Sequence, residues 1–309
     1  MTIPLIVAFT PNYLVPAATT LRSVLEASPK EVGYDVVCLV SEMPDEDFRA
    51  KLSLIDGGTG RLSFRFLNLE HKLQGAYVDQ RYTSAANYRL VIAEELPEYR
   101  YAIYTDCDVI VRQDLSRLYS QLDMGDAYIA GVAEAQTQWQ RQRSAHFDLE
   151  PGSYINSGFL VLNLESMRRD GLSQRFVTFL SEAEYLEFPD QDAINVVCRG
   201  RLYYLPPVYN GIRTFTLPAF RDLFLGLYTI EDWQAVAREG NIHYTGEKPW
   251  RSYTSYMELW WQTYWRLPEA IRSEMQLPKQ VERLARLFSL PGVRRLLNWW
   301  QLRTKKQEQ

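Results

Sequence analysis

Residues 101–111 are Tyr-Ala-Ile-Tyr-Thr-Asp-Cys-Asp-Val-Ile-Val, an apolar stretch interrupted by two carboxylates. Tyr101 to Thr105 is predicted to form a buried strand, with Asp106 and Asp108 at its carboxyl end. Because side chains alternate along an extended chain, residues two apart can point to the same side. Two neighbouring carboxylates are unfavourable unless a cation neutralises them, so the pair predicts a divalent cation that bridges to a diphosphate.

On both sides of this stretch, strand-like apolar runs alternate with helix-like ones. Strands are predicted at 3–9, 34–40, 62–67, 101–105, 127–132 and 158–164, and helices at 15–27, from 44, and at 84–96, 173–185 and 190–198. The alternation predicts an α/β fold with a single, mostly parallel, Rossmann-like sheet that binds ligands at the carboxyl ends of its strands. Residues 134–153 are expected to form a surface loop or lid, and 201–230 to be irregular.

The composition is that of an ordinary globular protein, with 309 residues, 46% hydrophobic and 23% charged. Three cysteines without CxxC spacing argue against a disulfide framework or a structural zinc site. No apolar run approaches the roughly 18 residues of a membrane span, and the N-terminus lacks the pattern of a signal peptide. We therefore expect a cytoplasmic protein.

The charge is unevenly distributed along the chain. Residues 279–309 hold eight Lys/Arg and two Asp/Glu, which leaves 26 Lys/Arg against 36 Asp/Glu in residues 1–278. An acidic body argues against nucleic-acid binding. Residues 279–309 also carry two apolar stripes at helical spacing, so we expect a globular domain over 1–278 and a basic amphipathic helical tail over 279–309. Such a tail suits the surface of an anionic membrane or a partner's groove, and we favour the membrane.

A second cluster of polar residues lies near the end of the globular part, in Ile242-His243-Tyr-Thr-Gly246-Glu-Lys248-Pro-Trp250. The imidazole of His243 could complete the cation site, Gly246 lets backbone approach a phosphate, and Lys248 adds positive charge. Oxygen ligands with one imidazole favour Mn²⁺, with Mg²⁺ as the alternative.

Two further segments combine polar side chains with a strand or helix start. Asn156 and Ser157 come just before the strand predicted at 158–164, and Asp190-Gln191-Asp192 begins a predicted helix. We interpret Asp192 as a first-turn acid of that helix, without a catalytic role. Seven aromatic residues between 250 and 265 fall largely at helical spacing and predict a buried helix face.

Together these motifs resemble family 8 glycosyltransferases, the group that contains glycogenin and bacterial lipopolysaccharide galactosyl- and glucosyltransferases. The resemblance runs from about residue 3 to 265 and implies a nucleotide-sugar-binding sheet of the GT-A type with a smaller acceptor-side region. It implies that the metal ligands are Asp106, Asp108 and His243. It also implies that Asp190 and Gln191 lie beside the anomeric carbon, and that the donor is bound by Ala8, Thr10, Asn12, Tyr13, Arg89, Asp106, Cys107, Asn156, Ser157, Asp190, Gln191, Gly246 and Lys248.

The implied activity is transfer of a hexose from UDP-galactose or UDP-glucose to a glycan acceptor, such as lipopolysaccharide, with retention of configuration. Trp250, next to Lys248 in the sequence, is the candidate contact for that acceptor. Retention requires same-face attack or an intermediate on Asp190 or Gln191, and both routes stay open. One rival is a phosphatase of the haloacid-dehalogenase type, with Asp106 as the nucleophile. That motif normally opens its chain, whereas about a hundred residues precede it here. The other rival is a protein that binds nucleotide-sugars without turnover.

Overall fold

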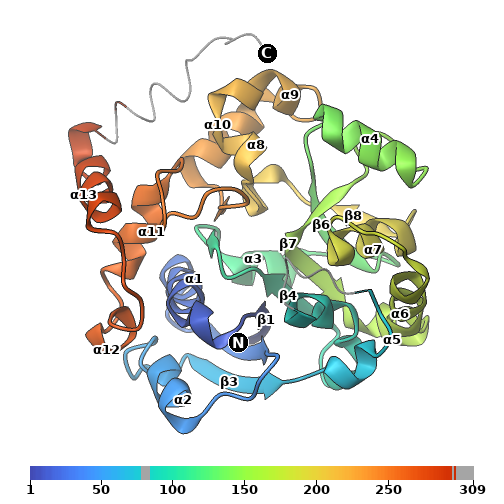
Figure 1. Cartoon of the computed structure of the whole chain (residues 1–309), viewed down its shortest axis with the longest axis horizontal. Coiled ribbons are helices and arrows are strands. Elements are labelled where there is room, and N and C mark those ends of the chain that lie inside the picture. The colour runs from blue at the N-terminus through green and yellow to red at the C-terminus, as the bar shows by residue number, and fades with distance from the viewer. Residues whose placement is uncertain (78–83, 294–295, 297–309) are drawn as a thin grey trace.

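The computed structural model describes residues 1–77, 84–293 and 296, and is built around one seven-stranded sheet (Figure 1). The strand order is β3-β2-β1-β4-β7-β6-β8. The bounds are β1 Thr2–Ala8, β2 Gly33–Leu39, β3 Leu62–Leu67, β4 Tyr101–Thr105, β6 Ile129–Ala133, β7 Ile155–Asn163 and β8 Leu202–Tyr204. A separate two-stranded ribbon pairs β5, Val109–Ile110, with β9, Ile242–His243.

The helices flank this sheet. Their bounds are α1 Leu14–Ala27, α2 Glu46–Ser53, α3 Leu115–Gln121, α4 Gln138–His146, α5 Leu164–Arg169, α6 Leu172–Glu182, α7 Pro189–Val197, α8 Arg213–Thr216, α9 Arg221–Leu225, α10 Ile230–Glu239, α11 Met257–Tyr264, α12 Glu269–Arg272 and α13 Lys279–Phe288. Short 3₁₀ helices cover Pro11–Tyr13, Glu70–Leu73, Ser84–Leu90, Ala93–Glu95, Pro207–Tyr209 and Pro218–Phe220. Within the described residues, none of the helices is long and apolar enough to cross a bilayer.

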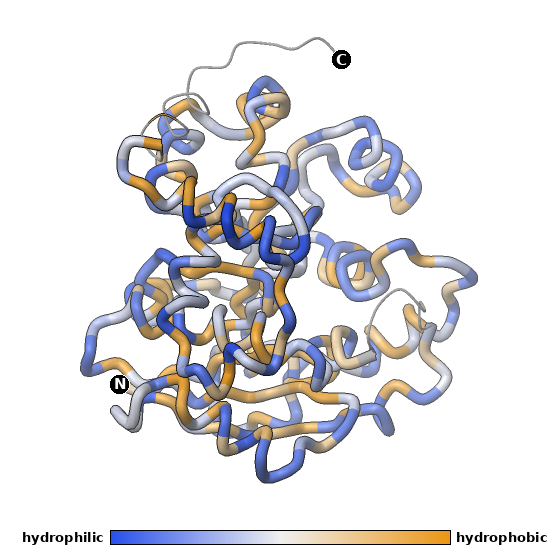
Figure 2. Tube along the Cα trace, turned by 60° about the vertical axis from the view of Figure 1, so that its left-hand side comes forward, coloured by the Kyte–Doolittle hydropathy of each residue, from blue (hydrophilic) through white to orange (hydrophobic). Residues whose placement is uncertain are grey.

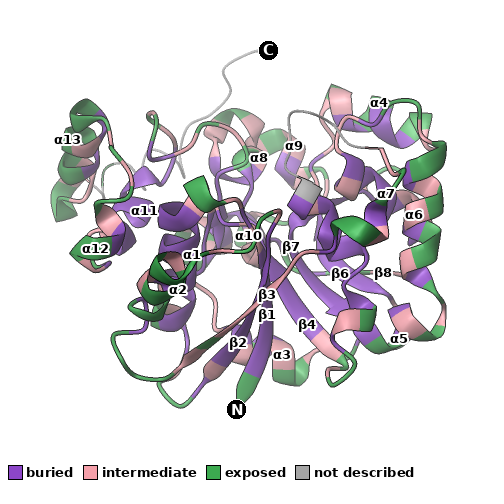
Figure 3. Cartoon of the chain, turned by 60° about the horizontal axis from the view of Figure 1, so that its bottom comes forward, coloured by how far each residue is buried: buried purple, intermediate pink, exposed green. Residues whose placement is uncertain are grey.

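The core lies on both faces of the sheet, as the apolar strands predict. Figure 2 shows hydrophobic segments running through the middle of the molecule, and Figure 3 shows the central strands β1, β2, β4, β6 and β7 as mostly buried, whereas β3 and β8 at the two edges of the sheet are intermediate or exposed. β1 pairs in parallel with β2 and β4, β2 with β3, and β6 with β8. The predicted mostly parallel sheet is therefore confirmed, with one exception: β7 runs antiparallel to both neighbours.

Three local predictions are wrong. The segment 201–230, expected to be irregular, contains β8, which joins the sheet, and the short helices α8 and α9. The segment predicted as one helix over 84–96 forms the two 3₁₀ helices Ser84–Leu90 and Ala93–Glu95. Here Arg89 Nε donates to Ala86 O at 2.7 Å, so a side chain takes a carbonyl that an α-helix needs. The predicted loop at 134–153 contains α4, whose N-cap Thr137 accepts from Gln140 N. Its polar sequence lacks the apolar period that reveals a helix.

The predicted aromatic helix face is confirmed in α11, where Trp260 and Trp261 are fully buried. The helix α13 packs against α11, and its Val281 and Ala285 belong to the main core. The first helix of the expected tail, α13, therefore packs on the globular domain, and the domain does not end at residue 278. The remaining basic residues of the predicted tail lie outside the described part of the chain: Arg294, Arg295, Arg303, Lys305 and Lys306.

Candidate active site

The candidate site lies where β1 and β4 end and β7 begins. Leu5 and Ile103 are paired in the parallel register of β1 and β4, so Phe9 and Asp106 emerge at the same edge. The antiparallel β7 starts at this edge, and Asp106 N donates to Gly158 O at 2.8 Å. Polar groups from distant parts of the sequence thereby line one cleft of about 840 Å³.

The predicted metal ligands lie together. Asp106 follows β4 and Asp108 precedes β5, whose Val109 pairs with His243 of β9. One ligand atom from each of Asp106, Asp108 and His243 lies within 4.8 Å of the others. The pairing of β5 with β9 therefore brings His243 next to Asp106 and Asp108, which lie more than a hundred residues earlier in the sequence.

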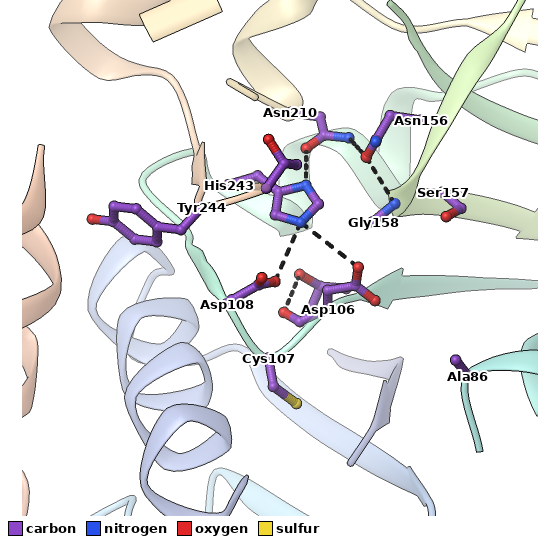
Figure 4. A network of polar contacts seen from close by, with 12 residues as sticks. Ala86, Asp106, Cys107, Asp108, Asn156, Ser157, Gly158, Asn210, His243 and Tyr244 are labelled. Atoms are coloured by element: carbon purple, nitrogen blue, oxygen red, sulfur yellow. Dashed lines mark hydrogen bonds and ion pairs between the residues drawn. The ribbon is translucent and has the colours of Figure 1, made fainter. Parts of the chain in front are cut away.

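The hydrogen bonds around His243 fix which imidazole nitrogen carries the proton (Figure 4). The backbone N–H of Gly158 donates to Asn156 Oδ1 at 3.0 Å, which identifies that atom as an oxygen. Asn210 Nδ2 donates to the same oxygen at 2.9 Å, so Asn210 Oδ1 faces His243 Nδ1 at 3.0 Å. In the neutral imidazole the proton is thus on Nδ1, and Nε2 presents a lone pair.

That lone pair points at two carboxylates. His243 Nε2 lies 3.2 Å from Asp108 Oδ1 and 3.7 Å from Asp106 Oδ2. The Nε2 lone pair and the two carboxylates are all electron-rich hydrogen-bond acceptors, so their close approach is unfavourable without a positive charge between them. The residues present therefore fit a divalent cation with oxygen and imidazole ligands.

Gly158 is required by the approach of His243. A Cβ on Gly158 would lie 2.0 Å from His243 Cε1 and 2.9 Å from Asp106 Oδ2. No side chain larger than hydrogen fits between the imidazole and the start of β7 without moving a metal ligand.

Asp108 also pairs with Lys248. Lys248 Nζ lies 2.5 Å from Asp108 Oδ2. Burial alone would raise the pKa of Asp108, but the positive charge of Lys248 and its hydrogen bond to the carboxylate outweigh burial and hold that pKa well below its usual range. The carboxylate is therefore ionised at neutral pH, as a metal ligand requires.

Arg89 connects the metal side of the cleft to α7. It is 4% exposed and donates from Nη1 to Ser157 O at 2.7 Å. Its guanidinium also pairs with Asp106 Oδ1 at 3.2 Å and with Asp190 Oδ2 at 3.4 Å, and it stacks on the Tyr104 ring. Burial opposes the charged form, yet Tyr104 and the two carboxylates raise the pKa of Arg89. Arg89 thus stays charged and holds both carboxylates in place.

Gln191 is held by the start of β7 and by a carboxylate. Its Oε1 accepts from Asn156 Nδ2 at 3.0 Å and from Ser157 N at 3.1 Å, and its Nε2 donates to Glu134 Oε1 at 3.2 Å. Glu134 is absent from the sequence prediction. Burial raises the pKa of Glu134, although hydrogen bonds from Asn156 and Gln191 oppose that rise. The signal available in the sequence was a carboxylate two residues after the predicted strand at 127–132.

Asp192 has the structural role that the sequence predicts. It is fully buried, accepts from Arg143 Nε at 2.8 Å and from Tyr154 OH at 2.6 Å, and also accepts from the backbone N–H of Phe188. These contacts tie α4 and the start of α7 to the body.

Most of the predicted donor-binding residues line the cleft: Ala8, Thr10, Tyr13, Arg89, Asp106, Cys107, Asn156, Ser157, Asp190, Gln191 and Lys248. Among the described residues, Asn12 and Gly246 do not, and neither does Trp250, the predicted acceptor contact. Asn12 is exposed and accepts from the Thr10 hydroxyl at 2.5 Å. Trp250 is 2% exposed and packs against the rings of Tyr13 and Trp260. It thus supports Tyr13 and offers no face to an acceptor.

Comparisons with known proteins identify the family to which this chain belongs. The model of the family described as Glycosyl transferase family 8 matches residues 4–254. General stress protein A of Bacillus subtilis is 27% identical over 253 residues, which cover 74% of this chain and 85% of that relative. A lipopolysaccharide 1,2-glucosyltransferase of Escherichia coli K12 is 27% identical over 79% of this chain and 72% of its own length.

A solved structure shares the fold. The galactosyltransferase LgtC, in complex with donor and acceptor sugar analogues, superposes with a TM-score of 0.74 at 22% identity. The match covers 88% of this chain and all of LgtC. At this identity the likeness shows the fold, which is the expected GT-A arrangement.

Proposed function

Since the chain belongs to glycosyl transferase family 8, we propose that it transfers a hexose, galactose or glucose, from a UDP-sugar to a glycan acceptor with retention of configuration. The observation that carries the proposal is the cation site of Asp106, Asp108 and His243. It lies in the same cleft as Lys248 and as the polar side chains of Arg89, Asp190 and Gln191. Relatives named as lipopolysaccharide glucosyl- and galactosyltransferases support lipopolysaccharide or another cell-surface glycan as the acceptor.

The metal we propose is Mn²⁺, with Mg²⁺ as the alternative, held by Asp106, Asp108 and His243. When bound, such an ion neutralises charge that develops on the departing diphosphate. Lys248 adds a fixed positive charge to the same end of the cleft, and its pairing with Asp108 orients it before the donor binds.

The sugar end of the donor is assigned to Arg89, Asn156, Ser157, Asp190 and Gln191. Arg89 and Asp190 form an ion pair at the wall of the cleft, and hydroxyls of a hexose can bind to both groups. For retention, the acceptor attacks the face that UDP leaves, or Asp190 or Gln191 forms an intermediate. Mass spectrometry of the protein after incubation with donor alone distinguishes these routes, because a glycosylated peptide that contains residue 190 or 191 supports the intermediate.

For the C-terminal segment we propose attachment to the anionic cytoplasmic face of a membrane. The outer side of α13 supports this proposal, because Leu284 and Leu287 of the helix, and Leu290 just after it, are 40–52% exposed beside exposed Arg283 and Arg286. A chain that ends after Ser289 and carries Leu284→Gln and Leu287→Gln lacks both the apolar outer side of α13 and the basic residues beyond it, while Val281 and Ala285 still pack in the core. It should still release UDP but lose co-sedimentation with phosphatidylglycerol vesicles at low salt. Unchanged vesicle binding would contradict the membrane attachment.

Incubation of the purified protein with UDP-galactose and UDP-glucose, with Mn²⁺ or with excess chelator, tests the activity. If the protein is a metal-dependent hexosyltransferase, UDP is released from the donor in Mn²⁺, and no UDP is released in excess chelator. A phosphatase would release inorganic phosphate from phosphomonoesters, and a binding protein would bind the donor without turnover. Either of those results would overturn the proposed function.

A further inference from the structure

One positive charge in the cleft has no carboxylate partner. The cleft-lining cations among the described residues are Arg89, Arg213 and Lys248. Arg89 and Lys248 each form ion pairs with carboxylates of the cleft. Arg213 is exposed and, in the described part of the chain, has no carboxylate within ion-pair distance. Its guanidinium is therefore available to an anionic ligand.

The segment that carries Arg213 runs beside the segment that carries His243. Gly211 forms a parallel bridge with Ile242, and the Gly211 carbonyl accepts from His243 N at 3.1 Å. Two residues further along, Arg213 N donates to Thr245 Oγ1 at 3.2 Å. These contacts hold Arg213 next to the loop that follows the candidate metal ligand.

The side chain of Arg213 also packs against Gly246. A Cβ on Gly246 would lie 3.2 Å from Arg213 Cδ, 3.5 Å from Nη1 and 3.8 Å from Nε. The sequence predicts that the backbone of Gly246 approaches a phosphate, yet Gly246 does not line the cleft, whereas Arg213 does. The guanidinium thus lies against the residue that was expected to meet a phosphate, and it is the member of this pair that faces the cleft.

The charges around the cation site favour one more positive group. The two ligand carboxylates, Asp106 and Asp108, cancel the charge of a divalent cation, and Asp190 balances Arg89. Lys248 then supplies a single positive charge against the two negative charges of a diphosphate ester. A second cation at this end of the cleft would complete the neutralisation, and each such interaction is stronger in a cleft than in bulk water.

We propose that Arg213 binds the diphosphate of the nucleotide-sugar donor together with Lys248. This inference rests on the proposed function and deepens it by adding a residue to the donor site. A guanidinium presents its N–H donors in a planar fork that matches two phosphate oxygens, so it can also fix the orientation of the diphosphate. Because Arg213 has no ion pair that must break first, the full interaction is available to the ligand.

The test is titration calorimetry with UDP in excess Mn²⁺. We expect the affinity for UDP to fall about tenfold in Arg213→Gln, which removes the charge. The loss should be smaller in Arg213→Lys, which keeps the charge without the fork. The difference between the wild type and Arg213→Gln should shrink in high salt, because ions screen an exposed charge.

Two controls separate phosphate binding from other effects. Affinity for uridine, measured by saturation-transfer NMR, should be the same in the wild type and in Arg213→Gln, because uridine has no phosphate. Arg117→Gln removes the same charge from the exposed side of α3, outside the cleft, and should bind UDP as the wild type does. Circular dichroism checks that each variant is folded.

Three results would overturn this role of Arg213: equal UDP affinity of the wild type and Arg213→Gln, a loss as large for uridine as for UDP, or the same loss in Arg117→Gln. Each of them leaves the proposed function intact, because the wild type still binds UDP. A wild type that binds no UDP in Mn²⁺ would instead contradict the proposed function, and this inference with it.

Discussion

Asn210 Oδ1 lies 3.0 Å from His243 Nδ1, so a fully buried carboxamide sets the proton position of the candidate metal ligand. The same carboxamide donates to Asn156, which contacts Gln191 and Glu134. One chain of hydrogen bonds thus runs from the cation site to the sugar end of the cleft. Such outer partners orient the ligand and raise its basicity.

The first prediction is that Asn210→Ala weakens Mn²⁺ binding about 10- to 100-fold, the usual cost of losing an outer partner of a metal-bound histidine. Without Asn210 the imidazole can rotate or carry its proton on Nε2. Titration calorimetry with Mn²⁺ measures the loss, and circular dichroism checks the fold. Unchanged Mn²⁺ affinity in a folded variant would show that Asn210 does not position His243.

The second prediction concerns the close approach at β7. Gly158→Ala places a methyl group 2.0 Å from His243 Cε1, so the imidazole must move and Mn²⁺ affinity should be lost. Overpacking of this kind costs about 1–3 kcal/mol of folding stability. Gly292→Ala is the control, because a Cβ there meets no described atom within 4 Å. Wild-type metal affinity in Gly158→Ala would be inconsistent with the described arrangement.

The third prediction is a pH dependence that comes from Glu134. Burial raises its pKa in the folded protein, so the folded state binds this proton more tightly than the unfolded chain, where the pKa is about 4.3. The contribution to stability is therefore present below that pH and is lost as the pH rises. The melting temperature of the wild type, relative to Glu134→Gln, should fall between pH 4 and pH 7 in chelator. A difference that stays constant or grows would disprove the assignment.

The fourth prediction separates sugar binding from nucleotide binding. Asp190→Ala removes the partner of Arg89 at the sugar end, so it should depress transfer far more than it weakens UDP binding, because UDP lacks the sugar. Calorimetry with UDP and with the intact donor measures both. Equal losses for the two ligands would mean that Asp190 is structural.

Much of the fold and of the cation site could be predicted from the sequence. Strands with continuous apolar runs, such as β1 and β4, bury both faces and are visible in the residue pattern. Asp106 and Asp108 follow such a strand directly. The chemistry of an imidazole near Gly246 and Lys248 made His243 a candidate third ligand, and the family resemblance supported it. The pattern of the chain could not, because a two-residue ribbon such as β5–β9 has no periodicity.

Other parts left no local signal. Asn210 lies in a segment without regular pattern, and its role depends on the three-dimensional position of His243 and Asn156. The helix α4 is held by buried polar pairs, which hydrophobic periodicity cannot reveal. Trp250 was assigned to the acceptor because it neighbours Lys248 in sequence, whereas tertiary packing buries it between Tyr13 and Trp260.

The most direct measurement is anomalous diffraction at the manganese absorption edge from crystals soaked with Mn²⁺ and UDP. The account predicts one strong peak bonded to Asp106, Asp108 and His243 Nε2, next to the diphosphate, and its loss in Asp108→Asn crystals soaked in the same way. A diphosphate bound in the cleft with no peak between these three side chains would contradict the metal assignment.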